Sequence, residues 1–596
     1  MVAEPGSVSF GLAAYPHDDD QPVTREVTFR NLGDAPVTLA LSSVLTGPGG
    51  VAAPAGALEL SADSVTVPAG GTAFVQATSD TTLGGADGLY SGRITATGGG
   101  QTVVVPVGVN KEGPSYNLTV KVIARNGNPE PNYPVTLLGV DNEQSKHLAP
   151  DETGSVTVRL PQGEYLLNTF QEFERGTDDW IFFTLLAPSV QLTADRTVVL
   201  DARKAEPITT SVPDATAKQA NSGIGFDRTL KGGEYIYDAG GFRSGEMFTY
   251  NAGPKLPADQ LIGHVTSQWG IPGEDGFYTN TPYLYGIANY FPGDFPTGFD
   301  RKVKQSDLAT VDATVNSADG KRLFKMLFPT GPNGDSGWAR VIRLDPARTI
   351  RYYVDETPYG FGGATEEDSD GSDFPFGKWS LEGKSMPYKA GRYYRERWNA
   401  AAFVPSVYAA TRSAGQLGIS LYSLTDADGH TGQIELTGST KLYRDGAEIG
   451  STNRFGYVSV ANQPAGKASY KLVTTGTQQL WPFSTRMDLE STFTSSADQQ
   501  NLPIHTVGFR PDVDGNNTMA RTPVTTLPFE VKGGAVAKVK IEYSGDAGAT
   551  WRQAPVVGGK AVFPTPAGKA VSLRATATDA AGNSTTQTVI AAYSLR

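Results

Sequence analysis

Residues 25–42, REVTFRNLGDAPVTLALS, alternate polar and apolar side chains on both sides of a Gly33–Asp34 turn. A period of two places successive side chains on opposite faces of a strand, so the segment predicts two half-buried strands around a turn. Residues 64–78 repeat the design around Pro68–Gly71, and residues 88–109 repeat it around the glycines that begin at Gly98. Short strands separated by regular turn signals are typical of a β-sandwich.

The rest of the chain continues this pattern, and the 596 residues allow about four domains. Residues 113–205 predict a second, smaller sandwich, in which Pro161 and Gly163 form a turn between two strands. The stretch at residues 204–223 is either a linker or an edge strand. Residues 206–497 predict one large, aromatic-rich β domain, and residues 498–596 a final sandwich. Helical periodicity of any length is missing, so we predict an all-β chain of tandem β-sandwich modules.

Composition and charge exclude several classes of partner. The chain has 69 Gly and 39 Pro, a composition that suits many tight turns. Its net charge is −12. That charge argues against binding to nucleic acid or anionic membranes, both of which need a basic face. No run of eighteen apolar residues is present, which argues against membrane insertion, and residues 1–10 lack the pattern of a signal peptide. The chain has no cysteine, which excludes disulfides, thiolate metal sites and a cysteine nucleophile but not secretion.

Two short motifs resemble the nucleophile regions of serine proteases. Residues 330–341, TGPNGDSGWARV, contain the letters that surround the trypsin-type serine, here Ser336, but Trp338 stands where that family carries glycine. Residues 515–523, GNNTMARTP, are similar to the subtilisin motif, with Thr518 at the serine position. A serine nucleophile needs a histidine base and an orienting carboxylate, and none of the five histidines has the sequence context of that base. We interpret the first motif as a turn and the second as a coincidence. The histidines are His17, His147, His264, His430 and His505.

Three acidic, glycine-containing loops are candidate calcium sites. Alternating carboxylates on a turn can surround a hard cation, although none of these loops has the distal glutamate of a complete twelve-residue calcium loop. The alternative is a solvated turn, which we favour. Calcium is the only cofactor that the sequence suggests. The candidate ligands are Asp368, Asp370, Asp373, Asp426, Asp428, Asp512 and Asp514.

Aromatic side chains gather around residues 283–295 and 393–398. Such clusters can stack against sugars or peptide side chains. A large β domain without disulfides also needs them in its core, and we favour core packing.

Several segments together resemble the C-terminal region of large secreted subtilisin-like serine proteases of actinobacterial type. Residues 8–42 and 87–107 resemble the fibronectin-III-like module that follows the catalytic domain in that family. Residues 116–127 and 154–168 are similar to its transthyretin-like, carboxypeptidase-regulatory sandwich. Residues 423–450 and 484–496 look like later shared segments, and residues 541–556 and 571–583 like the terminal Ig-like module. The resemblance implies that the catalytic Asp, His and Ser lie upstream of residue 1, so no catalytic residue is assigned in this chain.

Two functions follow as predictions. The first is a non-catalytic accessory region of a secreted, extracellular serine endopeptidase. Its partners would be the upstream catalytic domain and a protein substrate or cell-surface polymer. The alternative is a free-standing cell-surface adhesin or carbohydrate-binding protein. A weaker third hypothesis is an enzyme with an unrecognised active site in residues 206–495.

Overall fold

The computed structural model describes residues 1–176, 179–241, 245–274, 276–317, 320, 322–334, 337–345, 348–365, 379–413 and 415–596. Within these residues the chain is all-β, which confirms the predicted fold class. The described helical turns are three short 3-10 segments, η1 (Pro48–Gly50), η2 (Ala202–Lys204) and η3 (Gln305–Asp307). Over the same residues, no helix has the length and apolar character needed to cross a membrane.

The first sandwich consists of two mostly antiparallel sheets that face each other. Val27 and Phe29 from one sheet and Ile94 and Val107 from the other are buried between them, because alternate residues of each strand point inward. The strands of the first sheet, in spatial order, are β1 (Val2–Glu4), β3 (Val23–Arg30), β7 (Thr72–Ser79) and β5 (Leu58–Leu60). Those of the second are β2 (Val8–Ala13), β9 (Gln101–Lys111), β8 (Gly88–Gly98), β4 (Val37–Thr46) and β6 (Ser64–Val67).

The turns of this sandwich lie where the sequence predicted them, but they connect strands in two different ways. β8 and β9 form a hairpin around Gly99 and Gly100, whose φ angles of 57° and 74° favour glycine. β3 and β4, on either side of Gly33, do not pair with each other: β3 pairs with β1 and β7, and β4 with β6 and β8. Residues 31–36 therefore cross from one sheet to the other.

The second sandwich shares a sheet with the segment that follows it. Its small sheet contains β13 (Ser155–Pro161), β10 (Ser115–Ile123) and β16 (Arg196–Asp201). The facing sheet contains β12 (Ser145–Leu148), β11 (Val135–Gly139), β14 (Gly163–Gly176), β15 (Asp179–Leu192), β20 (Gly245–Asn251), β17 (Glu206–Ser211) and β23 (Phe299–Lys302). β17 lies between β20 and β23, so residues 206–211 form an internal strand of this sheet. The sheet thus continues past residue 205.

Two further sheets form the middle of the chain. One contains β19 (Gly233–Gly241), β18 (Lys218–Leu230), β21 (Leu261–Gly270), β22 (Tyr283–Pro292), β27 (Arg348–Val354), β24 (Ala309–Val315) and β31 (Tyr393–Trp398). The other contains β26 (Ile342–Leu344), β25 (Leu323–Pro329), β28 (Pro358–Thr365), β29 (Trp379–Glu382), β34 (Thr431–Ile434), β33 (Gln416–Thr425) and β32 (Val404–Ser413), with β30 (Met386–Pro387) on β28 and β37 (Tyr457–Val460) on β33.

The C-terminal part contains two further sheets. The larger has β36 (Ala447–Thr452), β35 (Thr437–Arg444), β38 (Ala468–Thr477), β39 (Arg486–Ser495), β48 (Ser584–Leu595), β47 (Ala570–Thr578), β43 (Lys538–Ser544) and β44 (Arg552–Ala554), with β41 (Thr518–Met519) on β48. The smaller has β40 (Thr506–Phe509), β42 (Val524–Lys532), β46 (Lys560–Pro564) and β45 (Val556–Val557). Because β39 pairs with β48, this sheet spans residue 497.

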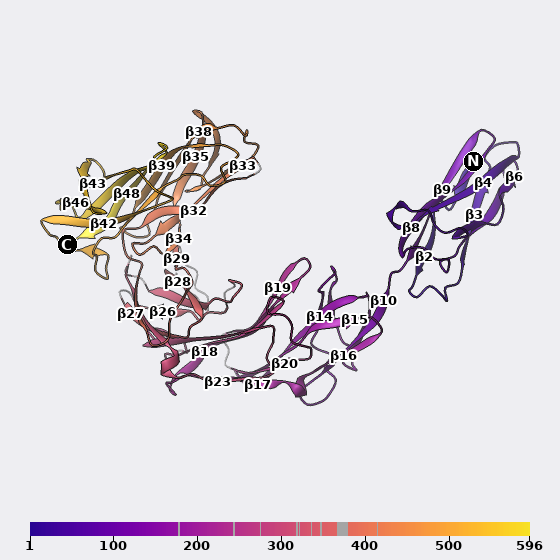
Figure 1. Cartoon of the computed structure of the whole chain (residues 1–596), viewed down its shortest axis with the longest axis horizontal. Coiled ribbons are helices and arrows are strands. Elements are labelled where there is room, and N and C mark those ends of the chain that lie inside the picture. The colour runs from indigo at the N-terminus through magenta and orange to yellow at the C-terminus, as the bar shows by residue number, and fades with distance from the viewer. Residues whose placement is uncertain are drawn as a thin grey trace.

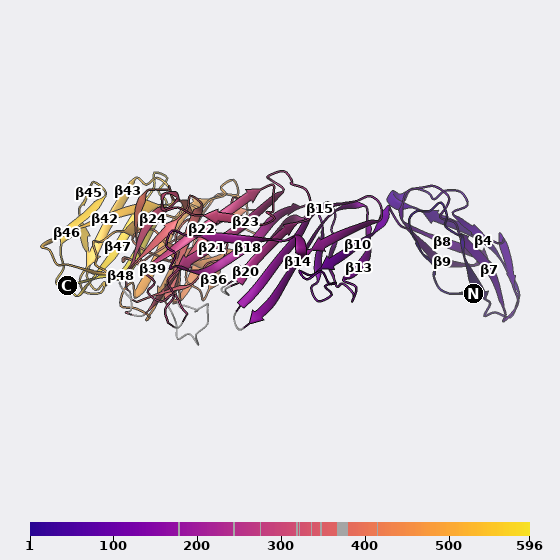
Figure 2. The ribbon, with the colours of Figure 1, turned by 90° about the horizontal axis from the view of Figure 1, so that it is seen from below.

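One hydrophobic cluster runs through these sheets from Ala220 to Leu595. The ring of Trp481 links distant parts of it, lying 5.1 Å from the ring of Trp379 and 4.9 Å from that of Phe403. Figure 1 shows the chain as an arc, with the first sandwich at one end and the C-terminal sheets at the other, and Figure 2 shows the same order from below. The long central sheets join the two ends.

Candidate functional site

The acidic loop at residues 426–430 folds around one buried carboxylate. Oδ1 of Asp426 accepts the backbone N–H groups of Asp428 and His430, at 3.1 and 3.0 Å. Oδ2 accepts the backbone N–H of Asn399 at 3.0 Å and lies 2.8 Å from Nδ1 of His430. A carboxylate only accepts, so Nδ1 carries the proton and the imidazole is held in one orientation. The oxygens of Asp426 thus already have protein donors.

The other described acidic candidates are engaged in different ways. Asp428 forms an ion pair with Arg397 at 2.8 Å. Asp514 accepts two N–H groups of its own turn and pairs with Arg596 at 2.8 Å. Asp512 is exposed. In the part of the chain that the structure describes, no three His, Cys, Asp or Glu side chains are grouped so as to hold a metal ion.

The remaining candidate residues divide between described and undescribed positions. Asn333 and Gly334, before Ser336, form the predicted turn, with the N–H of Gly334 donating to the carbonyl of Gly331 at 2.9 Å. Thr518 lies in β41 beside β48, and its hydroxyl donates to a backbone carbonyl. The candidates outside the described residues are Ser336, Asp368, Asp370 and Asp373.

His430 lies on the wall of a cleft of about 400 Å³, within the range of about 300–1,000 Å³ that small-ligand sites occupy. The cleft lies where the 426–430 loop and the end of β31 meet β40 and β42. We call it the Trp398 cleft. It is lined by Phe361, Gly383, Lys384, Met386, Tyr388, Glu396, Trp398, Asp428, Gly429, His430, Arg510, Glu530 and Lys532.

Trp398 is held between two basic side chains. The His430 ring stacks on it, with centroids 3.6 Å apart and an interplanar angle of 12°. Nζ of Lys325 lies 3.2 Å from the Trp398 ring centroid, a cation–π contact. Lys325 is buried, and burial lowers its pKa to about 7, against the opposing effect of the Glu396 and Asp426 carboxylates. The indole thus separates a buried amine from an oriented imidazole.

A second carboxylate fixes the edge of the indole. Glu396 accepts the indole N–H of Trp398 at 3.0 Å and the hydroxyl of Tyr388. Burial, and then the neighbouring Glu396, raises the pKa of Tyr388, so its hydroxyl stays protonated as the donor. The packing leaves no room for a side chain at Gly383, where a Cβ would lie 2.8 Å from Cη2 of Trp398. The wall of the cleft is therefore a preorganised polar network.

The sequence pointed to the 426–430 loop but not to its histidine. The loop DADGH was a candidate calcium site, with a solvated turn as the favoured interpretation, and in the structure Asp426 orients His430. Lys325 and Glu396 carried no local signal, because each lies in an ordinary strand pattern and meets Trp398 only in the folded chain. The sequence signal that could have indicated this contact is His430, which follows Asp426 by four residues across a turn that contains Gly429.

The two aromatic clusters pack mainly in the interior, as the core interpretation predicted. Phe295 and Tyr285 are buried in the first cluster, and Trp398 in the second. Tyr393 is the exception: half of its surface is exposed, and its hydroxyl contacts Asp312.

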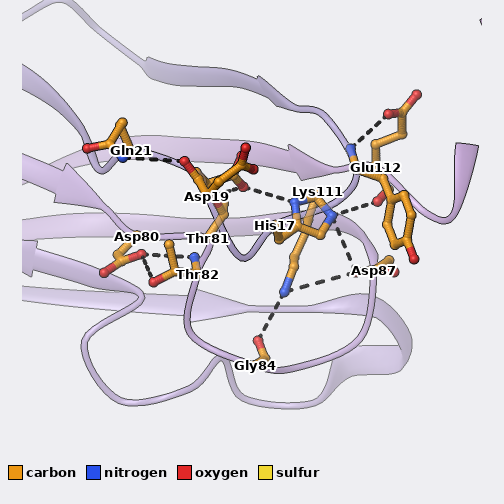
Figure 3. Close-up of polar contacts among 12 residues, drawn as sticks. His17, Asp19, Gln21, Asp80, Thr81, Thr82, Gly84, Asp87, Lys111 and Glu112 are labelled. Carbon is orange, nitrogen blue, oxygen red and sulfur yellow. Dashed lines mark hydrogen bonds and ion pairs between the residues drawn. The ribbon is translucent and has the colours of Figure 1, made fainter.

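A separate polar cluster around His17 and Glu112 lies at the end of the first sandwich (Figure 3). Nδ1 of His17 lies 2.9 Å from Oδ2 of Asp20, and its Nε2 lies 2.7 Å from the backbone carbonyl of Glu112. Arg159 of β13 reaches across to the Glu112 carboxylate, with Nε donating to Oε1 at 3.1 Å and Nη2 to Oε2 at 2.7 Å, and it donates to the carbonyl of Tyr15 at 2.6 Å. This bidentate contact ties the second sandwich to the end of the first.

Comparisons with known proteins give no family. No family model matches the chain, and no curated protein matches it. The similar solved structures include SSP-19, an MSP-domain protein of Caenorhabditis elegans. It is 13% identical and covers 18% of this chain and 99% of its own, with a TM-score of 0.14.

Two further solved structures illustrate the range of similarity. PapD-like domain 7 of human CEP192 is 15% identical and covers 18% of this chain and 83% of its own, with a TM-score of 0.15. The Bacillus anthracis TIE protein is 9% identical and covers 66% of this chain and 73% of its own, with a TM-score of 0.16. At these scores the similarity does not extend to function.

Proposed function

We propose that this chain is the non-catalytic accessory region of an extracellular subtilisin-like serine endopeptidase. In this role it supports the catalytic domain and holds protein substrate or a cell surface near it. The order of sequence segments that resemble that family supports the proposal. So does the architecture, because tandem sandwiches that share sheets form a stiff support.

The observation that carries the proposal is the continuity of the sheets. β15 and β20 pair in parallel across residue 205, and β39 pairs with β48 across residue 497. Strands that exchange backbone hydrogen bonds cannot move independently, so the units from residue 113 onward hold a fixed spacing. A scaffold of fixed length that holds substrate raises its effective concentration at a tethered active site.

In the described part of the chain, the imidazole of the cleft has a carboxylate partner but no hydroxyl partner. Among the described residues, no serine hydroxyl is hydrogen-bonded to a histidine, although Asp426 and His430 form the carboxylate–imidazole half of such a relay. No described residue hydrogen-bonds to Nε2 of His430. The cleft therefore has an oriented imidazole without an adjacent nucleophile.

A fluorophosphonate probe tests this directly, because it reacts only with activated serines. We expect no labelling of this chain and no hydrolysis of casein. Fusion to a subtilisin-like catalytic domain is expected to accelerate casein hydrolysis and leave turnover of a short chromogenic peptide unchanged. Labelling at Ser336, or equal casein rates with and without this region, would refute the proposal.

One observation favours the alternative, a carbohydrate-binding surface protein. Tyr408 is 65% exposed and meets Tyr422 edge to face at 5.1 Å on the outer side of β32 and β33. Tyr457, paired opposite Ser420, is also exposed on this sheet. Exposed tyrosines on a sheet offer an amphipathic contact surface. A glycan array on the wild-type chain and a Tyr408→Ala variant tests it; binding that this substitution abolishes would favour the alternative.

A further inference from the structure

The Trp398 cleft is lined by both acidic and basic side chains. The two kinds differ in whether they already have partners within the protein. Its acceptors are engaged: Glu396 by Tyr388 and Trp398, Asp428 by Arg397, and Glu530 by Arg510. The buried Asp426 behind the wall accepts four hydrogen bonds. Each of the three lining carboxylates thus already has a partner from the protein.

The donors of the same wall are not all engaged. Lys384 and Lys532 both line the cleft and are exposed, and neither ammonium has a hydrogen bond or ion pair with any described residue. Both lysines lie near the His430 loop. Lys384 follows Gly383, where a Cβ would lie 3.3 Å from Cδ2 of His430, and Nζ of Lys532 lies 3.4 Å from where a Cβ would stand on Gly429. Apart from His430, three basic and three acidic side chains line the cleft, and Lys384 and Lys532 are the basic ones without a partner among the described residues.

We propose that the Trp398 cleft binds the carboxylate side chains of an acidic peptide segment. Lys384 and Lys532 would supply charge-assisted hydrogen bonds, and His430 would border the bound carboxylate. The partly exposed Met386, beside the lysines, offers an adaptable apolar contact for the rest of the peptide. This inference rests on the proposed function and names the class of protein segment that the accessory region would hold.

The cleft favours a peptide over a sugar because the indole ring of Trp398 has no free face. Sugars in protein sites commonly lie flat on an aromatic ring. Both faces of Trp398 are covered, one by Lys325 and the other by His430. Tyr388 is 1% exposed. An acidic polysaccharide could therefore contact the lysines of the cleft but could not stack on an aromatic ring.

Fluorescence polarisation with a labelled hexaglutamate peptide tests the proposal on the whole chain. A hexaglutamine peptide of the same length is the control for charge. We expect hexaglutamate to bind and hexaglutamine not to bind. A Lys384→Gln/Lys532→Gln variant is expected to weaken hexaglutamate binding by about tenfold or more, because both charge-assisted contacts are lost.

A matched variant controls for the general loss of positive charge. Lys560→Gln/Lys569→Gln removes the same charge at two exposed lysines that do not line the cleft. It is expected to leave the affinity within about twofold, since charges at a distance are screened by salt. All four lysines are exposed, so both variants are expected to melt at the wild-type temperature.

Three outcomes would overturn the inference: equal binding of hexaglutamate and hexaglutamine, equal weakening by the two double variants, or tighter binding of an oligogalacturonate than of hexaglutamate. The proposed function is judged separately. If hexaglutamate does not bind while the fused region still accelerates casein hydrolysis, the cleft assignment fails and the accessory role stands. If hexaglutamate binds but the fusion gives no acceleration, the cleft assignment stands and the accessory role fails.

Discussion

At the scale of single residues, the Trp398 cleft depends on groups that are buried and charged. Asp426 is fully buried and accepts from three backbone N–H groups and His430. Such a network is stabilising only while every member is satisfied, because an unpaired polar group in the interior costs about 1–3 kcal/mol. Two substitutions separate the role of the carboxylate from that of the amine.

Asp426→Asn replaces one accepting oxygen with a donating amide that faces N–H groups. We expect a loss of stability of about 1–3 kcal/mol and loss of the fixed His430 orientation. Thermal melting and the NMR signals of the His430 ring measure the two effects. Asp428→Asn, in a partly exposed ion pair, is the control and should lose at most about 1 kcal/mol. Equal losses in the two variants would contradict this account of Asp426.

Lys325→Met tests the buried amine. Burial lowers the pKa of Lys325 from 10.5 to about 7, so between these pH values the unfolded chain binds a proton that the folded chain does not. The free energy of unfolding of the wild type should therefore rise with pH across this window, by up to about 1.4 kcal/mol per pH unit. Methionine binds no proton.

The variant is therefore expected to be more stable than the wild type near neutral pH. The difference in stability should shrink as the pH rises toward the ordinary lysine pKa of 10.5. Urea unfolding followed by tryptophan fluorescence at several pH values measures it. Lys560→Met, at an exposed site, should show no such trend. A difference that does not change with pH would contradict the assigned burial effect.

At the scale of elements, the position of the His430 loop depends on how closely β34 approaches β29. Gly432 of β34 pairs with Leu381 of β29, and a Cβ on Gly432 would lie 1.9 Å from the carbonyl oxygen of Ser380. A side chain there must push the two strands apart. The sheet therefore needs glycine at this position because two backbones meet.

Gly432→Ala is expected to destabilise the chain by about 1–3 kcal/mol and to weaken hexaglutamate binding, because the displaced strand carries His430 with it. Gly418→Ala is the matched control: Gly418 lies in β33 of the same sheet and has nothing within 4 Å of its added Cβ. Thermal melting compares the two variants. If both alanines were tolerated equally, the close approach of β34 and β29 would be wrong.

At the scale of the whole molecule, the contacts between units decide what folds independently. The first sandwich meets the second through the Glu112–Arg159 contact, and the Arg159 hydrogen bond lowers the pKa of Glu112. The contact is therefore formed above the ordinary glutamate pKa and is lost as the pH falls through the lowered value. The C-terminal sheets, in contrast, share backbone pairing and one core.

Arg159→Ala is expected to widen the range of angles between the first two sandwiches. Small-angle scattering should show a broader distribution of molecular lengths for the variant at neutral pH. The wild type should approach the same distribution in acid, when Glu112 becomes protonated. A wild-type profile that does not change with pH would contradict the role of this ion pair.

Removal of residues 498–596 tests the predicted boundary after residue 497. The deletion takes β48 away from β39 and uncovers part of the shared core, so we expect an aggregating product. Removal of residues 1–112 should leave a folded remainder, because the first sandwich has its own core. Circular dichroism and gel filtration distinguish these outcomes. A soluble, folded chain of residues 1–497 would support independent modules.

The sequence alone determined the fold class and many of the turns. Alternation of polar and apolar residues is a local property, so it predicts a strand wherever one face is buried, as in β8 and β9. It also located the 426–430 loop as a polar turn. These features depend on neighbours within a few residues, which the sequence displays directly.

Only the tertiary structure decided which strands pair and where the cleft lies. β3 and β4 flank one turn but belong to different sheets, and β39 pairs with β48 about 100 residues later in the chain. Lys325, Trp398, His430 and Lys532 come from separate strands and loops. Their roles arise from burial and proximity, which depend on long-range packing, so the local pattern of each segment could not reveal them.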